Sequence, residues 1–244
     1  MNLEIVYLYT SLTGEEVSAD LARYYKWTAS RFCDSFIKYC SSSANSRLVV
    51  VATGGEPLDG NFVDLLADHG PQYFHYNGTG RDIGAFRAYA SRTSADYLML
   101  LGSACYFWCE DVIDRTFDCL VTNEDSVIAP MASYEVRPHL RTCCFATKAS
   151  ILRSYPYPTN SISEVYDFEH GPRSLTNWAI NVGLTPLMYT LGDEFRLEEW
   201  RDPPNVFRRG DQTNCVIWDR HVDIYRSASE ETKVELEGRA NGRN

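Results

Sequence analysis

Short apolar runs alternate with longer amphipathic segments through the first 130 residues of the chain. Continuous β-branched or leucine-rich runs such as RLVVVA and YLMLL are typical of strands that are buried on both faces. The segments between them place apolar residues near 3.6-residue spacing, which predicts helices. The predicted strands are residues 3–9, 47–52, 72–76, 97–101, 127–131 and 142–147. The predicted helices are residues 15–39, 61–68, 81–92 and 111–121.

This alternation predicts the α/β class, with a three-layer α/β/α sandwich around a mostly parallel central sheet. After Tyr155 the pattern changes to a Pro- and Ser-rich stretch, followed by a helix near residues 175–183 and a late strand at residues 186–191. Residues 1–200 are therefore expected to form the α/β domain, and residues 201–244 a C-terminal loop and tail. The polar residues from Glu230 onward predict a disordered end or a frayed helix.

Charge and cysteine content narrow the class of protein. The net charge of −10 comes without any run of Lys or Arg, which disfavours nucleic-acid binding. No apolar run approaches the ~20 residues that span a bilayer, and the amino terminus runs straight into a strand pattern without a signal peptide. We therefore expect a cytoplasmic protein with reduced thiols. Cys105 and Cys109 lack a second ligand pair at zinc-finger spacing, so buried core cysteines are favoured over zinc.

Small and polar residues follow four of the predicted strands. In an open parallel sheet, ligands bind beyond the carboxyl ends of the strands. That rule selects Thr10 and Ser11, residues 53–55, residues 77–84, and Gly102 with Ser103. Small residues let a ligand approach the backbone, where free N–H groups can bind phosphate.

The segment YNGTGRDIGAF carries most of the chemical information. Gly80 and Gly84 permit a tight turn into a helix whose amino terminus favours an anion. Arg81 adds a planar, positively charged guanidinium group, and Asp82 adds a hydrogen-bond acceptor for a ribose or for the edge of a base. A dinucleotide site of the Rossmann type is one interpretation, but the spacing is imperfect and the turn follows the third strand instead of the first. A helix entry with Asp82 in its first turn is the other interpretation.

Four segments of the sequence carry a resemblance to a known family. They are NGTGRDIGAFRAY, YLMLLGSACYFW, IAPMASYEVRPHLRTCCFATKASIL and FEHGPRSLTNWAINVG. This pattern, over roughly residues 1–195, resembles bacterial and viral GT-A-type glycosyltransferases and is most similar to the rhamnan-synthesis-protein-F-like group. The resemblance implies transfer of a hexosyl or deoxyhexosyl group from a nucleoside-diphosphate-sugar to a glycan or lipid-linked acceptor, as in polysaccharide biosynthesis. Taken with the strand-end rule, it implies nucleotide-sugar contacts from Thr10, Ser11, Gly80, Arg81, Asp82, Gly84, Gly102 and Ser103.

One position departs from that family. Many GT-A enzymes hold a divalent metal with Asp-x-Asp after the fourth strand, where this chain has Gly102, Ser103 and Ala104. Three explanations remain open. Cations such as Arg81 or Arg141 neutralise the diphosphate, a metal ion is held elsewhere, or the chain has lost activity. Glu110 and Asp111, a few residues on, are interpreted as acids that cap the next helix.

Candidate catalytic groups lie in the segment YDFEHG. A base that removes the proton of the acceptor hydroxyl can be a carboxylate or an imidazole. The resemblance places this base at Glu169, at the start of an acceptor-facing helix, with His170 as its partner and Asp167 as a rival. The alternative is that Asp167 and Glu169 are only helix-N-terminal acids. His221 is a further candidate for folding back onto the diphosphate or a metal ion, against the alternative of a surface or packing histidine.

Two other functions remain open from the sequence. A nucleotidyltransferase or dinucleotide-binding enzyme would use the same edge of the sheet. A non-catalytic GT-A-like module would bind a glycan or a protein partner, and the missing Asp-x-Asp keeps this reading open.

Overall fold

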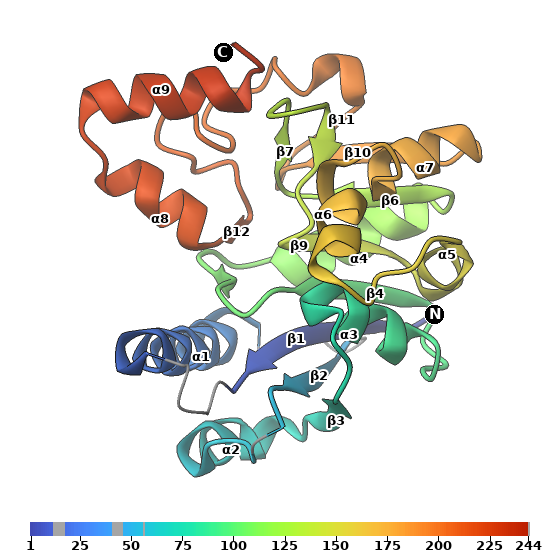
Figure 1. Cartoon of the computed structure of the whole chain (residues 1–244), viewed down its shortest axis with the longest axis vertical. Helices are drawn as coiled ribbons and strands as arrows, with labels where there is room; N and C mark the ends of the chain where they lie inside the picture. Colours follow the sequence, from blue (N-terminus) through green and yellow to red (C-terminus); the bar gives the residue numbers. More distant parts are fainter. Residues whose placement is uncertain (12–17, 41–45, 56, 244) are drawn as a thin grey trace.

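The central sheet has eight strands in the order β11-β10-β6-β9-β4-β1-β2-β3 (Figure 1). It belongs to a computed structural model that describes residues 1–11, 18–40, 46–55 and 57–243. The sheet strands are β1 (Leu3–Thr10), β2 (Ser46–Thr53), β3 (Gln72–Tyr76), β4 (Tyr97–Leu101), β6 (Ser126–Ala129), β9 (Cys144–Lys148), β10 (Thr185–Tyr189) and β11 (Glu194–Phe195). Strands β1, β2, β3 and β4 are parallel, as predicted.

Strand β9 runs antiparallel between β4 and β6, which the sequence did not indicate. Its first residue, Cys144, pairs with Leu101, the last residue of β4. The chain that enters β9 therefore lies at the same edge of the sheet as the carboxyl ends of the parallel strands. This register brings residues 141–143 beside the turn that follows β4.

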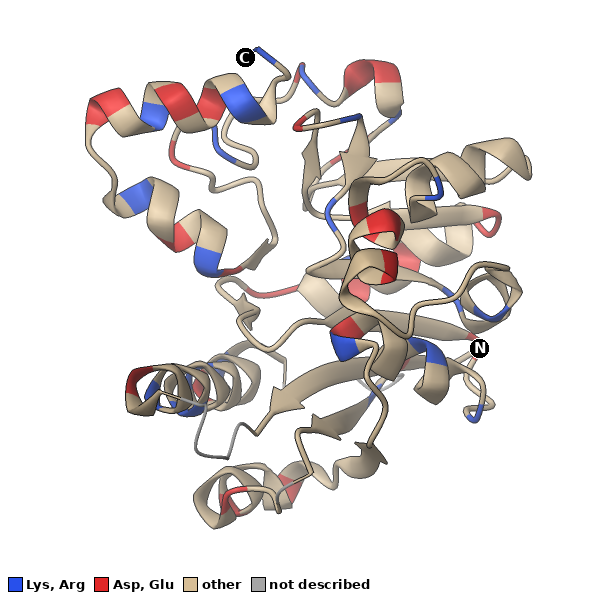
Figure 2. Ribbon diagram, in the orientation of Figure 1, with Lys and Arg blue, Asp and Glu red and all other residues tan. Residues whose placement is uncertain are grey.

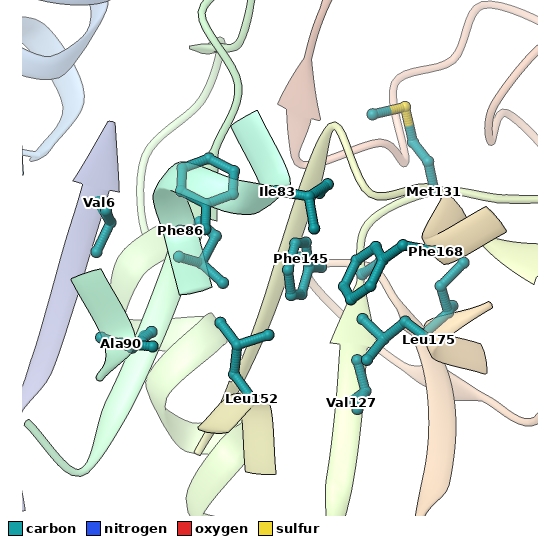
Figure 3. Packing of buried hydrophobic residues seen from close by; sticks show 14 of the residues in the cluster. Val6, Ile83, Phe86, Ala90, Val127, Met131, Phe145, Leu152, Phe168 and Leu175 are labelled. Atoms are coloured by element: carbon teal, nitrogen blue, oxygen red, sulfur yellow. The ribbon is translucent and has the colours of Figure 1, made fainter. Parts of the chain in front are cut away.

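Helices cover both faces of the sheet. They are α1 (Ala19–Cys40), α2 (Gly60–Leu66), α3 (Arg81–Ala90), α4 (Val112–Thr122), α5 (Ala149–Ser154), α6 (Ile162–His170), α7 (Leu175–Asn181), α8 (Arg220–Ser227) and α9 (Glu230–Ala240). Alternate residues of β1 point to opposite faces, so that Val6 joins a core with α3, α5, α6 and α7, whereas Tyr7 joins a core with α1, α2 and α4. Figure 3 shows the first core, where Phe86 of α3 packs near Phe145 of β9 and Phe168 of α6. The predicted three-layer α/β/α architecture is confirmed.

Helices α5 and α6 lie between residues 149 and 170, where the sequence pattern predicted no helix. Ser161 begins α6 with a capping box, because its hydroxyl accepts from the backbone N–H of Glu164 while the Glu164 carboxylate accepts from the backbone N–H of Ser161. The first predicted helix starts at Ala19 in the structure, and its predicted residues 15–17 lie outside the described ranges.

The C-terminal segment is more ordered than predicted. Of the two alternatives expected from Glu230 onward, a disordered end and a frayed helix, the structure has a helix, since Glu230–Ala240 forms α9 with the Ser229 hydroxyl accepting from Thr232 N–H as its N-cap. Figure 2 shows acidic and basic positions mixed along α9, which explains why the segment looks unstructured from composition. Ala240 is buried, and its carbonyl accepts a hydrogen bond from the backbone N–H of Tyr134.

Two short strands join this segment to the sheet domain. Strand β12 (Ile217–Trp218) pairs antiparallel with β5 (Tyr106–Phe107), which follows the turn after β4. Trp108 stacks on Trp218 with ring centroids 4.8 Å apart, and its Nε1–H donates to the carbonyl of Cys215. As a result, α8 begins close to the carboxyl edge of β4. In the part of the chain that the structure describes, no helix is long and apolar enough to cross a membrane.

Candidate active site

A cavity of about 620 Å³ lies at the carboxyl edge of β4. Its walls come from α1, the start of α3, the turn after β4, the loop that enters β9, the end of α6 and the start of α8. Nineteen residues line it: Tyr24, Tyr25, Asp82, Gly102, Ser103, Ala104, Cys105, Glu135, Val136, His139, Arg141, Thr142, Cys143, Tyr166, Glu169, His170, Asp219, Arg220 and His221. Five of the eleven site residues expected from the sequence are among them, namely Asp82, Gly102, Ser103, Glu169 and His170.

The turn after β4 forms the floor of this cavity. The backbone N–H of Gly102 donates to the carbonyl of Cys143 over 2.8 Å, which ties the turn to the start of β9. A Cβ on Gly102 would lie 3.1 Å from that carbonyl oxygen, so the close approach favours glycine. The buried hydroxyl of Tyr7 donates to the carbonyl of Ser103 and fixes the turn from below.

Asp82 occupies the first turn of α3. Its Oδ1 accepts a 2.9 Å hydrogen bond from the backbone N–H of Ile83. Burial raises the pKa of the Asp82 carboxyl, although backbone hydrogen bonds and the charge of Arg81 act in the opposite direction. The helix-entry interpretation of this turn is confirmed, and Asp82 also lines the cavity, so that contact with a ligand stays a prediction.

Glu169 reaches the same cavity from α6, which packs beside α3 on one face of the sheet. It lies in the last turn of α6, so its predicted position at the start of a helix is wrong. Burial, together with the charge of Asp82, raises the pKa of Glu169 to about 7, against the opposing effects of Arg141, the Thr142 hydroxyl and Arg81. Figure 2 shows acidic positions both on α6 and at the start of α3. Asp82, Gly102 and Ser103 from the predicted donor residues thus line the same cavity as Glu169.

Two histidines lie beside Glu169. The rings of His139 and His170 are 5.8 Å apart between centroids. Burial lowers the pKa of His139 to about 4, and its Nδ1 is 2.7 Å from the carbonyl oxygen of Arg137. His139 is therefore neutral at neutral pH, and the short Nδ1 contact indicates that Nδ1 carries the proton and donates to that carbonyl.

The first turn of α8 closes the cavity on the side of α1. Asp219 is the N-cap of α8, and its Oδ1 accepts from the backbone N–H groups of His221 and Val222 over 2.8 and 3.0 Å. Burial and the charge of Arg141 hold the pKa of His221 below its usual value. Arg220 lies over the ring of Tyr24, with 5.5 Å between the guanidinium carbon and the ring centroid. His221 therefore lines the cavity, as one of its sequence interpretations required.

Arg141 lies just before β9, next to the turn after β4. Its guanidinium carbon is 4.4 Å from the centroid of the Phe207 ring. Its buried Nε has no hydrogen-bond partner in the part of the chain that the structure describes. Burial by itself would lower the pKa of Arg141. The nearby Cys143, Asp219 and Glu169 raise this pKa by more than burial lowers it, so the guanidinium group stays cationic.

Other residues expected in the site lie outside the lining. A Cβ on Gly80 would stand 1.9 Å from the carbonyl oxygen of Thr159, and one on Gly84 would stand 2.5 Å from the hydroxyl of Tyr76. These glycines allow α3 to pack closely against its neighbours. Arg81 is exposed and has a positive φ of 49°.

Thr10, Ser11 and Asp167 also lie outside the lining. Thr10 is the last residue of β1 and Ser11 follows it, and Ser11 donates its backbone N–H to the carbonyl of Thr53. Asp167 accepts at Oδ1 from the backbone N–H of Arg173 over 3.2 Å, beyond the end of α6. Its carboxylate therefore fixes the α6–α7 connection.

Sequence reasoning assigned Tyr24, Tyr25, Glu135, His139, Asp219 and Arg220 no role as site residues. Tyr24 and Tyr25 lie in the helix predicted over residues 15–39, where their spacing indicates a helix and gives no sign of a ligand. Asp219 directly precedes α8, and an Asp at that position is an N-cap signal that can be read from sequence. The sequence pattern gives no sign that Asp219 lies at the carboxyl edge of the sheet.

The described part of the cavity shows no preformed site for a divalent metal ion. Among the described residues, no group of three or more His, Cys, Asp or Glu side chains is placed to hold one. Within the cavity, Asp219 already caps α8, and Glu135 pairs with Arg208 over 3.0 Å. The turn at residues 102–104 supplies no carboxylate.

Comparison with known proteins supports the fold. No family model and no curated protein matches the sequence. A solved structure of the mannosyltransferase PcManGT from Pyrobaculum calidifontis, in complex with GDP-Man and Mn²⁺, aligns with a TM-score of 0.54 at 10% identity, over 77% of this chain and 54% of that one. S. aureus TarS 1-349 aligns with a TM-score of 0.51 at 8% identity, over 72% of this chain and 56% of that one.

The chain therefore has a GT-A-like fold and spans about half the length of these two structures. At 8% and 10% identity the likeness shows the fold alone. Similarity to the rhamnan-synthesis-protein-F-like group stays a prediction.

Proposed function

We propose that the chain binds a nucleoside-diphosphate-sugar in this cavity and transfers the glycosyl group to a hydroxyl of a glycan or lipid-linked acceptor. The observation that carries the proposal is that Asp82 and Glu169 line one cavity at the carboxyl edge of β4, beside the cation Arg141. In open α/β sheets this edge is where ligands bind. The solved PcManGT, with the same overall fold, was captured with GDP-Man.

The donor is assigned to the side of the cavity formed by the start of α3 and the turn after β4. Asp82 offers a carboxylate oxygen to hydroxyls of the donor, while Gly102 and Ser103 let the donor approach the backbone. Thr10 and Ser11 extend this edge along β1 and are proposed to contact the nucleoside. Tyr24 and Tyr25 add flat apolar surface with polar edges, which suits a sugar or a base.

Glu169 is proposed as the base. It takes the proton of the acceptor hydroxyl as that oxygen bonds to the anomeric carbon and the bond from that carbon to the phosphate oxygen breaks. The nucleoside diphosphate leaves with the electron pair of that bond. A base is most effective when its pKa lies near the working pH, and the pKa of Glu169 is about 7. His170 borders Glu169 and is assigned to position the acceptor.

The test is a thermal-shift panel of UDP, GDP and dTDP species and their sugars, followed by detection of released nucleoside diphosphate with candidate acceptors. A ligand at a hundred times its dissociation constant adds about 2.7 kcal/mol to the free energy of unfolding. A selective shift with turnover supports transfer. A shift by NAD(P) alone would favour a dinucleotide enzyme and overturn the proposal.

A non-catalytic binding module is the second candidate, favoured by the absence of a carboxylate from residues 102–104. It predicts glycan or nucleotide-sugar binding without release of nucleoside diphosphate under any acceptor tested. The two candidates therefore differ in turnover and agree in binding.

A further inference from the structure

The turn after β4 carries no negative charge, although it lies on the floor of the cavity. Gly102, Ser103 and Ala104 all line the cavity. The backbone N–H groups of Ser103 and Ala104 donate no hydrogen bond to the described part of the chain. Free backbone N–H groups in a turn attract anions, whereas a divalent cation requires oxygen ligands such as carboxylates.

Arg141 is a cation without a matching anion beside this turn. Among the described residues, no carboxylate lies within ion-pair distance of its guanidinium group, and its buried Nε has no partner. Phe207 supports one face of the guanidinium group and so limits the directions in which it can bind. A buried unpaired charge is costly, and a bound anion would offset that cost. The planar fork of Arg matches the geometry of phosphate oxygens.

A second cation faces the same space from α8. Arg220 lines the cavity and is exposed, and its guanidinium lies over the Tyr24 ring without a carboxylate partner in the described ranges. None of the four cavity carboxylates forms an ion pair with Arg141 or Arg220 in the described ranges, although the charges of Asp219 and Glu169 raise the pKa of Arg141. Asp219 accepts from two backbone N–H groups, Glu135 pairs with Arg208, and Asp82 and Glu169 have raised pKa values.

We infer that Arg141 and Arg220, with the backbone N–H groups of Ser103 and Ala104, form a diphosphate-binding site that works without a divalent metal ion. The inference rests on the proposed function, because the diphosphate is that of the donor. On this assignment, the two arginines neutralise the charge that builds on the leaving nucleoside diphosphate. The arrangement differs from that of PcManGT, whose complex contains Mn²⁺.

The probe is inorganic pyrophosphate, titrated by calorimetry into the full chain that has been stripped of metal and kept in excess EDTA. We expect binding in EDTA with the same affinity, within about twofold, as in a titration with Mn²⁺. Arg141→Gln should weaken pyrophosphate binding about 10- to 100-fold, the usual effect of losing hydrogen bonds to a charged group. Arg141→Lys should recover only part of that affinity, because an ammonium group lacks the fork.

Arg226→Gln is the matched control for Arg220→Gln. Both arginines lie on α8, but Arg226 stacks on Trp218 and donates to the carbonyl of Asp211, outside the cavity lining. Arg220→Gln should weaken pyrophosphate binding, and Arg226→Gln should leave it unchanged. Circular dichroism and melting temperature establish that each variant is folded.

Pyrophosphate binding that disappears in EDTA and returns with Mn²⁺ would overturn the inference, as would an unaltered protein that binds no pyrophosphate. The titration of the unaltered protein decides this even if Arg141→Gln does not fold. Metal-free binding that depends on Arg141, in a protein that turns over no nucleotide-sugar, would leave the anion site standing and reject the proposed function. Nucleotide-sugar turnover that requires Mn²⁺ would support the proposed function and overturn the metal-free diphosphate site.

Discussion

The side chains of Asp82 and Glu169 line one cavity from the first turn of α3 and the last turn of α6, and the charge of Asp82 contributes to raising the pKa of Glu169. Replacing Asp82 with Asn removes that charge. We expect the pH at which turnover reaches half its maximum to move to a lower value, measured as kcat at saturating donor. An unchanged midpoint would show that burial by itself sets the pKa of Glu169.

Glu169→Gln should lower kcat about 10²- to 10⁴-fold, the usual contribution of a general base. The dissociation constant of the donor should stay within about twofold, because the base acts on the acceptor. Asp167→Asn is the neighbouring control, since the Asp167 carboxylate accepts from Arg173 N–H outside the cavity lining. If Glu169→Gln stays active while the Asp167→Asn or His170→Gln variant loses turnover, the base has been assigned to the wrong residue.

Glu169 should also make stability depend on pH. Its pKa of about 7 in the folded protein lies above its ordinary value of 4.5, so the folded state holds the proton more tightly than the unfolded state. The stabilisation from this proton is complete below pH 4.5 and is lost as the pH rises through about 7. Urea unfolding at pH 5 and pH 8 should therefore show Glu169→Gln gaining stability relative to the unaltered protein at pH 8. An equal difference at both pH values would contradict the raised pKa.

Gly80→Ala should destabilise the protein, because the new Cβ would lie 1.9 Å from the backbone carbonyl oxygen of Thr159. Overpacking of this kind costs about 1–3 kcal/mol, measured by denaturant unfolding. Gly192→Ala is the control, since nothing lies within 4 Å of the Cβ it would carry. If the two variants are equally stable, close packing of α3 is not the reason for glycine at position 80.

Asp219→Ala and Ser229→Ala each remove the N-cap of a C-terminal helix. Each should lower the free energy of unfolding by about 0.5–2 kcal/mol. Only Asp219→Ala should also weaken nucleotide-sugar binding, because α8 begins with Arg220 and His221 in the cavity wall, while α9 lies outside it. Comparable loss of affinity in both variants, by calorimetry, would mean that general destabilisation causes the effect.

Most strands of the sheet were predictable because they are local apolar runs, whereas the two-residue strand β11 was not predicted. Residues 72–76 and 97–101 were predicted with the bounds that the structure gives to β3 and β4. Helix α6 was missed because a Pro- and Ser-rich stretch leads into it, although Ser161 and Glu164 form a capping box that can be read from sequence. For α9 the sequence left a frayed helix and a disordered end both open, because its mixed charges resemble those of a disordered tail.

The candidate site was predictable on one side. Asp82, Gly102 and Ser103 follow strand ends, and the strand-end rule finds such residues. The meeting of Glu169 with Asp82 depends on how α6 packs beside α3, and the approach of Asp219 depends on pairing between β12 and β5. Contacts across about 85 to 110 residues of chain leave no local pattern, so these neighbours required the structure.

The pairing of Phe107 with Ile217 has a consequence for a chain that is still being made. Synthesis proceeds from the amino terminus, and all eight strands of the central sheet are complete once Phe195 has left the ribosome. At that stage the cavity lacks the wall that carries Asp219, Arg220 and His221. A nascent chain can thus acquire its sheet before it can enclose a ligand.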